Sequence, residues 1–278
     1  MKKIYVGKNV IVTGGSGGIG STVVASFLGE GAKVLTLGKE KNQLRKPLIG
    51  VSAMQIDVSD RNQLKKVGEY IKERFSGRVD VLVNAAGIYG PKGNLEELDL
   101  DFWEKTVQVN LMGTVNMCAL VIPFMKTAGR GKIINFSGGG DSAFPKFTAY
   151  SSSKGAVIRF TESLAAELAE DNIFVNAVAP GPVNTALVEE VLNAGPGKVG
   201  RVFYLASKKQ KAEGGISPGL ASDLILFLAS ENSGNLKGKI ISAVHDEWKN
   251  IPKHLGVLSK TDIYNNRRIK PKDRGYDW

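Results

Sequence analysis

A glycine-rich turn directly after a short apolar run constrains this chain more than any other feature of its sequence. The run Asn9–Thr13 leads into Gly-Gly-Ser-Gly-Gly-Ile-Gly at positions 14–20, and an apolar, helix-like stretch follows at once. This string fits both the GxGxxG and the GxxxGxG patterns of glycine spacing. In a strand–turn–helix unit, such glycines let a pyrophosphate approach the first free N–H groups of the helix. The sequence therefore predicts a dinucleotide site, although a tight turn without a ligand could use the same glycines.

Short apolar runs alternate with amphipathic stretches along most of the chain. Runs rich in Val and Ile are typical of strands buried on both faces of a parallel sheet. In the stretch 61–74, Leu64, Val67 and Ile71 share one helical face. We expect one α/β domain of the doubly wound, Rossmann type, with helices on both faces of a parallel sheet. The expected strands are Asn9–Thr13, Lys33–Leu37, Ser52–Ile56, Val79–Asn84, Lys132–Phe136, Ile173–Ala179 and Lys239–Ser242, and the expected helices are Ser21–Gly29, Arg61–Arg74, Asp101–Thr127, Tyr150–Glu170 and Leu220–Ala229.

The end of the second expected strand bears on which dinucleotide the chain prefers. Folds that prefer NAD commonly place Asp or Glu at this position, where the carboxylate accepts hydrogen bonds from the adenosine ribose. Here the strand ends in Leu37 and Gly38, and Lys39 follows without a carboxylate. A cation beside the ribose would favour the 2′-phosphate of NADP(H), so NADP(H) is the favoured cofactor and NAD(H) the alternative. Lys39 could also be an ordinary solvated lysine.

Tyr150 and Lys154 are the first candidates for chemistry, because a helix would place them on one face, one turn apart. An unperturbed tyrosine has a pKa near ~10 and is therefore a poor general base at neutral pH. An ammonium group about 4 Å away supplies on the order of 4 kcal/mol at an effective dielectric of ~20. We therefore expect Lys154 to lower the pKa of Tyr150. A YxxxK spacing alone also occurs by chance in many helices.

Two further polar residues precede this pair at suggestive spacings. Ser137 follows an apolar strand, and ligands of parallel sheets gather at the carboxyl ends of the strands. Asn110 lies in the middle of an expected helix, where asparagine is disfavoured. Ser142 is a rival for Ser137, and Ser137 could also simply cap its strand.

Together these motifs resemble the single-domain short-chain dehydrogenase/reductase family over residues 5–244. The family's TGxxxGxG motif appears in residues 13–20, its NAG motif in residues 84–87 and its PG motif in residues 180–185. The catalytic Asn, Ser, Tyr and Lys of the family match Asn110, Ser137, Tyr150 and Lys154.

The resemblance implies a role for each of these residues. Ser137 would hydrogen-bond the substrate oxygen, and Tyr150 would exchange a proton with it. Lys154 would tune Tyr150 and hold the nicotinamide ribose, while Asn110 would locally distort its helix and anchor a water molecule that links Lys154 to solvent. The cofactor contacts that this reading assigns are Gly14, Ser16, Gly17, Gly18, Ile19, Gly20, Lys39, Asp57, Val58, Asn84, Ala85, Gly87, Tyr150, Lys154, Pro180, Gly181, Val183 and Thr185.

Two segments depart from the regular alternation. Residues 181–219 are rich in Gly and Lys, and we expect a partly helical substrate lid there. Its cations, Arg201 and Lys208 among them, would suit an anionic substrate. Residues 245–278 form an expected C-terminal extension of little periodicity, which follows a catalytic domain of residues 1–244 and either packs against it or covers a substrate cleft.

Composition limits the partners that we expect. The chain has 37 Lys and Arg against 27 Asp and Glu, a net charge of +10, but the excess is spread along the sequence. We therefore expect no nucleic-acid partner, and no membrane anchor because no apolar run approaches ~20 residues. One cysteine and two histidines argue against a disulfide and a metal site, and together with the absence of a signal peptide they favour the cytoplasm. Relatives pair through the two long helices, so we expect a homodimer or homotetramer.

The predicted function is an NADP(H)-dependent oxidoreductase that interconverts a secondary alcohol and a ketone. The substrate would be a small carbonyl compound, and the glycine run 138–140 and the extension favour a polar, sugar-like one. A 3-oxoacyl thioester reductase is the alternative within the enzyme class. A non-catalytic, dinucleotide-sensing binding protein is the alternative outside it, although a pure sensor would need no proton relay.

Overall fold

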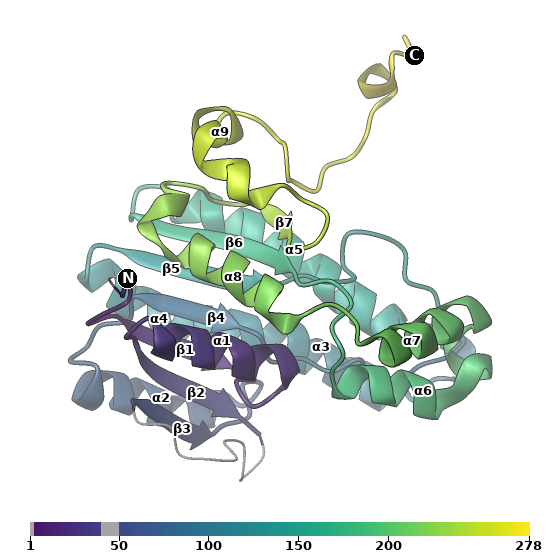
Figure 1. The fold of residues 1–278 in the computed structure, drawn as a ribbon, viewed down its shortest axis with the longest axis horizontal. Helices are drawn as coiled ribbons and strands as arrows, with labels where there is room; N and C mark the ends of the chain where they lie inside the picture. The colour runs from purple at the N-terminus through teal and green to yellow at the C-terminus, as the bar shows by residue number, and fades with distance from the viewer. Residues whose placement is uncertain (1–2, 40–49) are drawn as a thin grey trace.

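The computed structural model describes residues 3–39 and 50–278, and in this part of the chain a seven-stranded parallel sheet carries helices on both faces (Figure 1). The strand order is β3-β2-β1-β4-β5-β6-β7. The direction of winding reverses between β1 and β4, which is where doubly wound sheets bind their ligands. The predicted fold class is confirmed. The strands are β1 Asn9–Thr13, β2 Lys33–Gly38, β3 Val51–Gln55, β4 Val81–Asn84, β5 Gly131–Phe136, β6 Ile173–Ala179 and β7 Ile240–Ser242.

The central strands are mostly apolar because both of their faces are covered. In β1, Val10 and Val12 pack on the side of α1 (Gly18–Gly29) and α8 (Pro218–Ala229). Ile11 between them packs on the opposite side, against α2, α4 and α5. Alternate residues of one strand thus contribute to two separate cores. The helices of the second face are α2 Arg61–Arg74, α4 Gly113–Thr127 and α5 Thr148–Glu167.

The helix boundaries differ from the sequence-based expectation in ways that matter for the site. Helix α1 begins at Gly18, three residues before the expected start, so the last glycines of the turn are helical. The expected helix Asp101–Thr127 is divided into α3 (Leu100–Val107), a π-helical turn (Gln108–Met112) and α4. Helix α5 begins at Thr148, so Tyr150 lies inside its first turn. Strands β1 and β6 have the expected bounds, and the ends of the other strands differ from the expected ones by at most two residues.

The expected lid is more helical than predicted. It contains α6 (Ala186–Val199) and α7 (Arg201–Glu213), which lie beside the carboxyl ends of the strands (Figure 1). Gly195 and Gly200 have positive φ angles of 78° and 84° and turn the chain inside and after α6. These glycines weaken the helical pattern in the sequence without removing the helices.

The C-terminal segment also contains structure that its sequence pattern did not reveal. Helix α9 spans Ile251–Leu258 and buries both of these end residues in the same core as α1 and α8. Beyond it, the chain first returns to the body of the molecule: the N–H of Ile240 donates to the carbonyl of Tyr264, and Asn265 and Asn266 donate to Gly238 and Glu162. The residues after these run away from the body to the end of the chain (Figure 1). Short 3₁₀ turns occur at Leu95–Glu97, Glu231–Ser233, Trp248–Asn250 and Pro271–Arg274.

One helical run, Leu100–Thr127, is long and apolar enough to cross a membrane by length and composition alone. In the fold, its second half is α4, whose Met117, Cys118 and Val121 are fully buried beside the sheet. Of the most apolar 18-residue stretch of this run, 39% is buried inside the molecule.

Candidate active site

A cleft of about 1660 Å³ lies at the carboxyl ends of the strands, between the glycine-rich turn and the lid. Nearly all of the residues predicted to contact a cofactor line it. They are Gly14, Ser16, Gly17, Gly18, Ile19, Gly20, Lys39, Asp57, Val58, Ala85, Gly87, Tyr150, Lys154, Pro180, Gly181, Val183 and Thr185.

The turn after β1 is shaped so that no side chain could replace two of its glycines. Gly14 has a φ of +66°, and a Cβ there would lie 2.8 Å from the Cα of Ala86. A Cβ on Gly20 would lie 2.2 Å from the carbonyl oxygen of Gly14. The turn therefore closes onto the start of α1 and leaves the first N–H groups of that helix facing the cleft. This cradle fits the pyrophosphate of a dinucleotide.

The far end of the cleft carries two cations around one carboxylate. Lys39 Nζ lies 3.8 Å and Lys105 Nζ 3.5 Å from Asp57 Oδ2. Burial alone would raise the pKa of Asp57, but hydrogen bonds from Ser59 and the charges of Lys105 and Lys39 lower it. The pair leaves one positive charge in excess beside the end of β2. Sequence reasoning missed Lys105, which comes from α3 and has no local signal.

Asn84, predicted as a cofactor contact, lies behind the cleft and is not among the described residues that line it. Its Nδ2 donates to Asn135 Oδ1 at 2.9 Å and so joins β4 to β5. The turn that follows it is held instead by Thr13, whose Oγ1 accepts from the N–H of Ala86 at 3.1 Å.

Asn110 lies at the centre of the π-helical turn, fully buried. Its Nδ2 donates to the carbonyl of Ile88 and to Ser153 Oγ, both at 2.9 Å, and its Oδ1 accepts from the N–H of Ile88 at 2.9 Å. The distortion that the family resemblance implied is present. It turns the Asn110 side chain so that it ties the loop after β4 to helix α5.

Lys154 is buried, and its Nζ donates to the carbonyl oxygen of Phe136 at 2.9 Å. It lies 5.9 Å from the centre of the Tyr150 ring, and burial lowers its pKa to about 8. The expected lowering of the Tyr150 pKa is wrong for this structure. Burial of its hydroxyl, with a smaller contribution from Tyr89, raises the pKa of Tyr150 instead. A neutral phenol is thus held at the cleft wall, in the state that can donate a proton.

Ser137 is almost fully buried at the end of β5, and its Oγ finds no hydrogen-bond partner among the described residues. A buried hydroxyl without a partner is costly and usually awaits a ligand. Its rival Ser142 is exposed, and its Oγ lies 3.5 Å from Asp141. Ser142 is among the described residues that line the cleft and Ser137 is not, so the lining by itself does not choose between the two serines. Ser137 lies between two residues that do line it, Phe136 and Gly138.

An aromatic cluster that the sequence analysis did not identify surrounds Tyr150. The Tyr89 ring meets Tyr150 edge-on with centroids 4.7 Å apart. Phe144 stacks on the fully buried Phe147 at 4.4 Å, and Phe203 of the lid meets both of these rings edge-on. Tyr89, Phe144 and Phe203 all line the cleft. One indication of this cluster was present in the sequence: Phe144 and Phe147 lie between Ser137 and Tyr150 along the chain.

The cations of the lid do not face the cleft. Arg201 and Lys208 are exposed, and neither is among the described residues that line it, whereas Phe203, Ser207 and Gln210 of the same helix are. One face of α7 therefore turns apolar and neutral side chains inward and charged ones to solvent. The expectation that these cations bind an anionic substrate is not supported.

The chain is similar in sequence and structure to known oxidoreductases. A family model described as short chain dehydrogenase matches residues 8–195. A 3-oxoacyl-[acyl-carrier-protein] reductase FabG of Thermotoga maritima is 36% identical over 84% of this chain and 95% of its own length.

Two solved structures extend the comparison. The aldohexose dehydrogenase AldT of Thermoplasma acidophilum, in ligand-free form, has a TM-score of 0.75 at 28% identity and covers 87% of this chain and 93% of its own. ElxO with NADP bound has a TM-score of 0.73 at 30% identity over 85% and 96% of the two chains.

Proposed function

Because this chain belongs to the short-chain dehydrogenase/reductase family, we propose that it is an NADP(H)-dependent enzyme that interconverts a ketone and a secondary alcohol. The observation that carries the proposal is the cleft itself. It combines the glycine-rich cradle with the Tyr150–Lys154 pair, and the buried, unpartnered hydroxyl of Ser137 lies at the end of β5, between the lining residues Phe136 and Gly138. A non-catalytic dinucleotide sensor would not require Tyr150, Lys154 or Ser137.

When bound, the nicotinamide cofactor supplies or accepts the hydride, so the protein must position the carbonyl and manage one proton. In the direction of reduction, Ser137 Oγ donates a hydrogen bond to the carbonyl oxygen. The neutral Tyr150 hydroxyl donates its proton to the same oxygen as negative charge develops there. Lys154 supplies positive charge behind the phenol. Asn110 ties helix α5, which carries Tyr150 and Lys154, to the loop after β4.

NADP(H) is favoured over NAD(H) because Lys39 and Lys105 leave an excess positive charge at the adenosine end of the cleft. A 2′-phosphate there would meet two ammonium groups, and Asp57 neutralises only one of them. The similar structure of ElxO with NADP bound agrees with this assignment.

The substrate end of the cleft favours a ketone with an apolar or flat body. Its walls are Tyr89, Phe144 and Phe203, with Val188 and Val191 from α6. Aromatic faces bind flat apolar groups well, whereas a sugar needs a dense set of polar partners. The cleft is also lined by polar residues, Asp141, Ser142, Gln210, Asn265 and Asn266 among them, so a polar, sugar-like substrate stays a prediction that the ketone screen tests.

A 3-oxoacyl thioester remains a second candidate, because the Thermotoga maritima relative is a 3-oxoacyl-[acyl-carrier-protein] reductase. Its acyl chain would also suit an apolar wall. The thioester's carrier group would extend from the cleft past the lid.

A matched ketone screen tests the proposal. NADPH and NADH consumption would be followed with a bicyclic ketone such as 2-tetralone, with dihydroxyacetone and with acetoacetyl-CoA. We expect NADPH to be preferred and 2-tetralone to exceed dihydroxyacetone in kcat/KM by at least about tenfold. Consumption of neither cofactor with any ketone would refute the oxidoreductase. The order of 2-tetralone and acetoacetyl-CoA separates the two candidates.

We also propose that the enzyme acts in the cytoplasm as a homodimer or homotetramer. Leu120, Ile122 and Phe124 of α4 and Phe160 of α5 remain only partly buried in the single chain. Pairing through these helices would cover them. Light scattering that gave the mass of one chain at micromolar concentration would contradict the assembly.

A further inference from the structure

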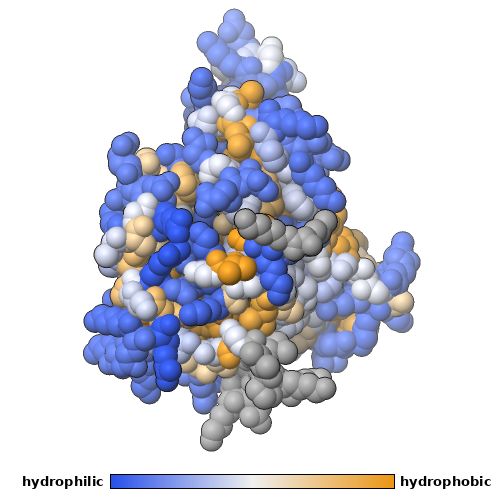
Figure 2. Space-filling view, turned by 60° about the vertical axis from the view of Figure 1, so that its left-hand side comes forward, coloured by the Kyte–Doolittle hydropathy of each residue, from blue (hydrophilic) through white to orange (hydrophobic). Residues whose placement is uncertain are grey.

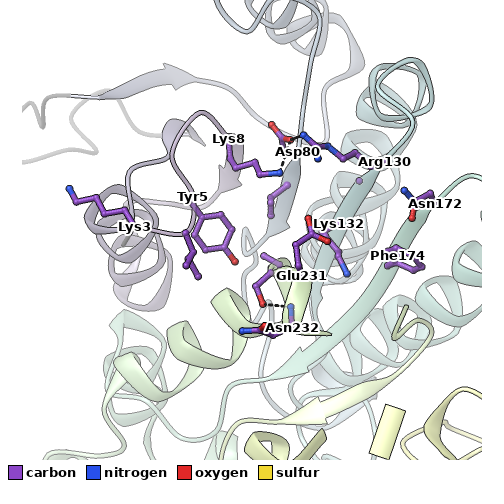
Figure 3. A pocket seen from close by; sticks show the side chains of 15 residues that line it. Lys3, Tyr5, Lys8, Asp80, Arg130, Lys132, Asn172, Phe174, Glu231 and Asn232 are labelled. Atoms are coloured by element: carbon purple, nitrogen blue, oxygen red, sulfur yellow. Dashed lines mark hydrogen bonds and ion pairs between the residues drawn. The ribbon is translucent and has the colours of Figure 1, made fainter. Parts of the chain in front are cut away.

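A second pocket, of about 490 Å³, lies at the opposite edge of the sheet, where the strands begin (Figure 3). The starts of β4, β5 and β6 form its wall, and the segment before β1 and the corner after α8 close its sides. It is separate from the cleft, which lies at the strand ends. Its volume is in the range that binds small molecules.

The lining of this pocket is electrically unbalanced. Lys3, Lys8, Arg130 and Lys132 contribute four cations, whereas Asp80 and Glu231 contribute two carboxylates. The carboxylate of Asp80 is buried and already shared, because Lys8 lies 3.7 Å and Arg130 3.6 Å from its Oδ1, with Arg78 closer still. Figure 3 shows the Lys8 and Arg130 side chains reaching Asp80 from two sides. An excess of two positive charges therefore faces a concave surface, which concentrates anions.

Lys132 is the most unusual of these cations, because it is only 9% exposed and forms no ion pair within the described residues. Its Nζ donates to Ser233 Oγ at 2.9 Å and to the carbonyl of Gly234 at 2.7 Å. An ammonium group has three hydrogens to donate, so one remains beyond these two bonds. Burial lowers the pKa of Lys132 to about 8, and an anion in the pocket would offset that cost.

The remaining lining of the pocket is partly apolar, with Asn172, Ser230 and Asn232 as its uncharged polar residues. Phe174 lies under the Lys132 ammonium, with Nζ 4.4 Å from the ring centre, and Ile4 and Val81 also contribute. Figure 2, which is turned toward this side of the molecule, shows a mostly hydrophilic surface with a small hydrophobic area near its middle. A ligand of this pocket would therefore combine negative charge with a small flat apolar group.

We propose that this pocket binds a small organic dianion, a phosphate monoester with a compact apolar group. Its two negative charges match the charge excess, and its oxygens can accept from Arg130, Lys8 and Lys132 together. The apolar group lies against Phe174. The active site takes no part in this argument, so the inference stands independently of the proposed oxidoreductase activity.

The test is calorimetric titration with phenyl phosphate at about 0.15 M ionic strength, using variants that change the charge of the pocket in opposite directions. Arg130→Ala removes a cation and should weaken binding about tenfold, the scale of one unit charge at about 6 Å and an effective dielectric of about 40. Glu231→Gln removes an exposed carboxylate of the rim and should tighten binding about threefold, because solvent screens it more strongly.

Two control variants exclude other sites. Lys39→Ala changes the cofactor cleft, and Lys253→Ala removes an exposed lysine of α9 that lines neither cavity. Both variants should leave the affinity for phenyl phosphate unchanged. Failure to bind phenyl phosphate at millimolar concentration would overturn the proposal. A loss of phenyl phosphate affinity in Lys39→Ala but not in Arg130→Ala would also overturn it, because the probe would then bind in the cofactor cleft. An equal loss with Lys253→Ala would show nonspecific attraction and would overturn it as well.

Discussion

Replacing Lys154 with methionine should stabilise the fold while it removes activity. Burial lowers the pKa of Lys154 from 10.5 to about 8. Each unit corresponds to about 1.4 kcal/mol, so keeping this lysine charged at pH 7 costs about 3 kcal/mol of folding free energy. Methionine has a similar length and no charge. Its substitution also removes the hydrogen bond to Phe136, which we place at about 1–2 kcal/mol. The net expectation is a gain of about 1–2 kcal/mol.

The pH dependence of the stability difference between Lys154→Met and the wild type provides a second, independent test. Because the pKa of Lys154 is lower in the folded than in the unfolded state, the cost of its charge is fully present below pH 8. That cost disappears as pH rises from about 8 to about 10.5. The advantage of Lys154→Met should therefore shrink over this interval, and near pH 10.5 the lost hydrogen bond should leave the variant slightly less stable.

Urea unfolding of the cofactor-free proteins at pH 7 and pH 10 measures both effects. Lys66→Met is the matched control, because Lys66 is exposed on α2 and its replacement should change stability by less than about 0.5 kcal/mol. Turnover of the best ketone by Lys154→Met should fall at least about 100-fold. A variant less stable than the wild type at pH 7 would refute the reasoning about buried charge.

Three further substitutions test the cleft. Ser137→Ala should lower kcat at least tenfold. It should leave the free energy of unfolding within about 0.5 kcal/mol of the wild-type value, because Ser137 Oγ has no hydrogen-bond partner among the described residues. A large loss of stability would show that the hydroxyl has a structural role instead. Gly20→Ala should abolish NADPH binding, measured by cofactor fluorescence. In Gly29→Ala, at the end of the same helix, the added Cβ meets no described atom within 4 Å, so NADPH binding should be retained. Equal NADPH binding by the two variants would contradict the proposal that the glycine-rich turn binds the pyrophosphate. The double variant Lys39→Ala/Lys105→Ala should raise KM for NADPH about tenfold and leave KM for NADH unchanged. An equal change in the two KM values would contradict the preference for NADP(H).

The sheet and the cofactor cradle could be predicted from the sequence because their signals are local. The core of a strand such as β1 is a continuous apolar run. In the turn that follows, a Cβ on Gly14 or Gly20 would lie within 3 Å of backbone atoms, so few other residues fit there. Helix α9 escaped prediction because it is short: Ile251 and Leu258 are buried and Leu255 packs beside them, too few apolar positions to show a helical period. The helices of the lid were not predicted in full because Gly195 and Gly200 interrupt the helical pattern of the sequence.

The chemistry of the site depends on distances that spacing along the chain does not determine. A helix places Tyr150 and Lys154 one turn apart, and Lys154 Nζ donates to the carbonyl of Phe136 and lies 5.9 Å from the centre of the Tyr150 ring. Burial raises the pKa of Tyr150, the opposite of the expected direction, and the sequence spacing does not show how deeply the hydroxyl is buried. Similarly, the aromatic wall brings together Tyr89, Phe144 and Phe203 from three distant segments, a proximity that only the fold creates.

The central claim is that the Tyr150 hydroxyl transfers the proton while the cofactor transfers hydride. The most direct measurement is the single-turnover rate of ketone reduction by Tyr150→Phe with saturating NADPH, alongside the dissociation constant for NADPH. The account predicts a rate at least about 100-fold below that of the wild type with cofactor binding preserved, since only the proton donor is lost. A Tyr150→Phe protein that reduces the ketone at the wild-type rate would contradict it.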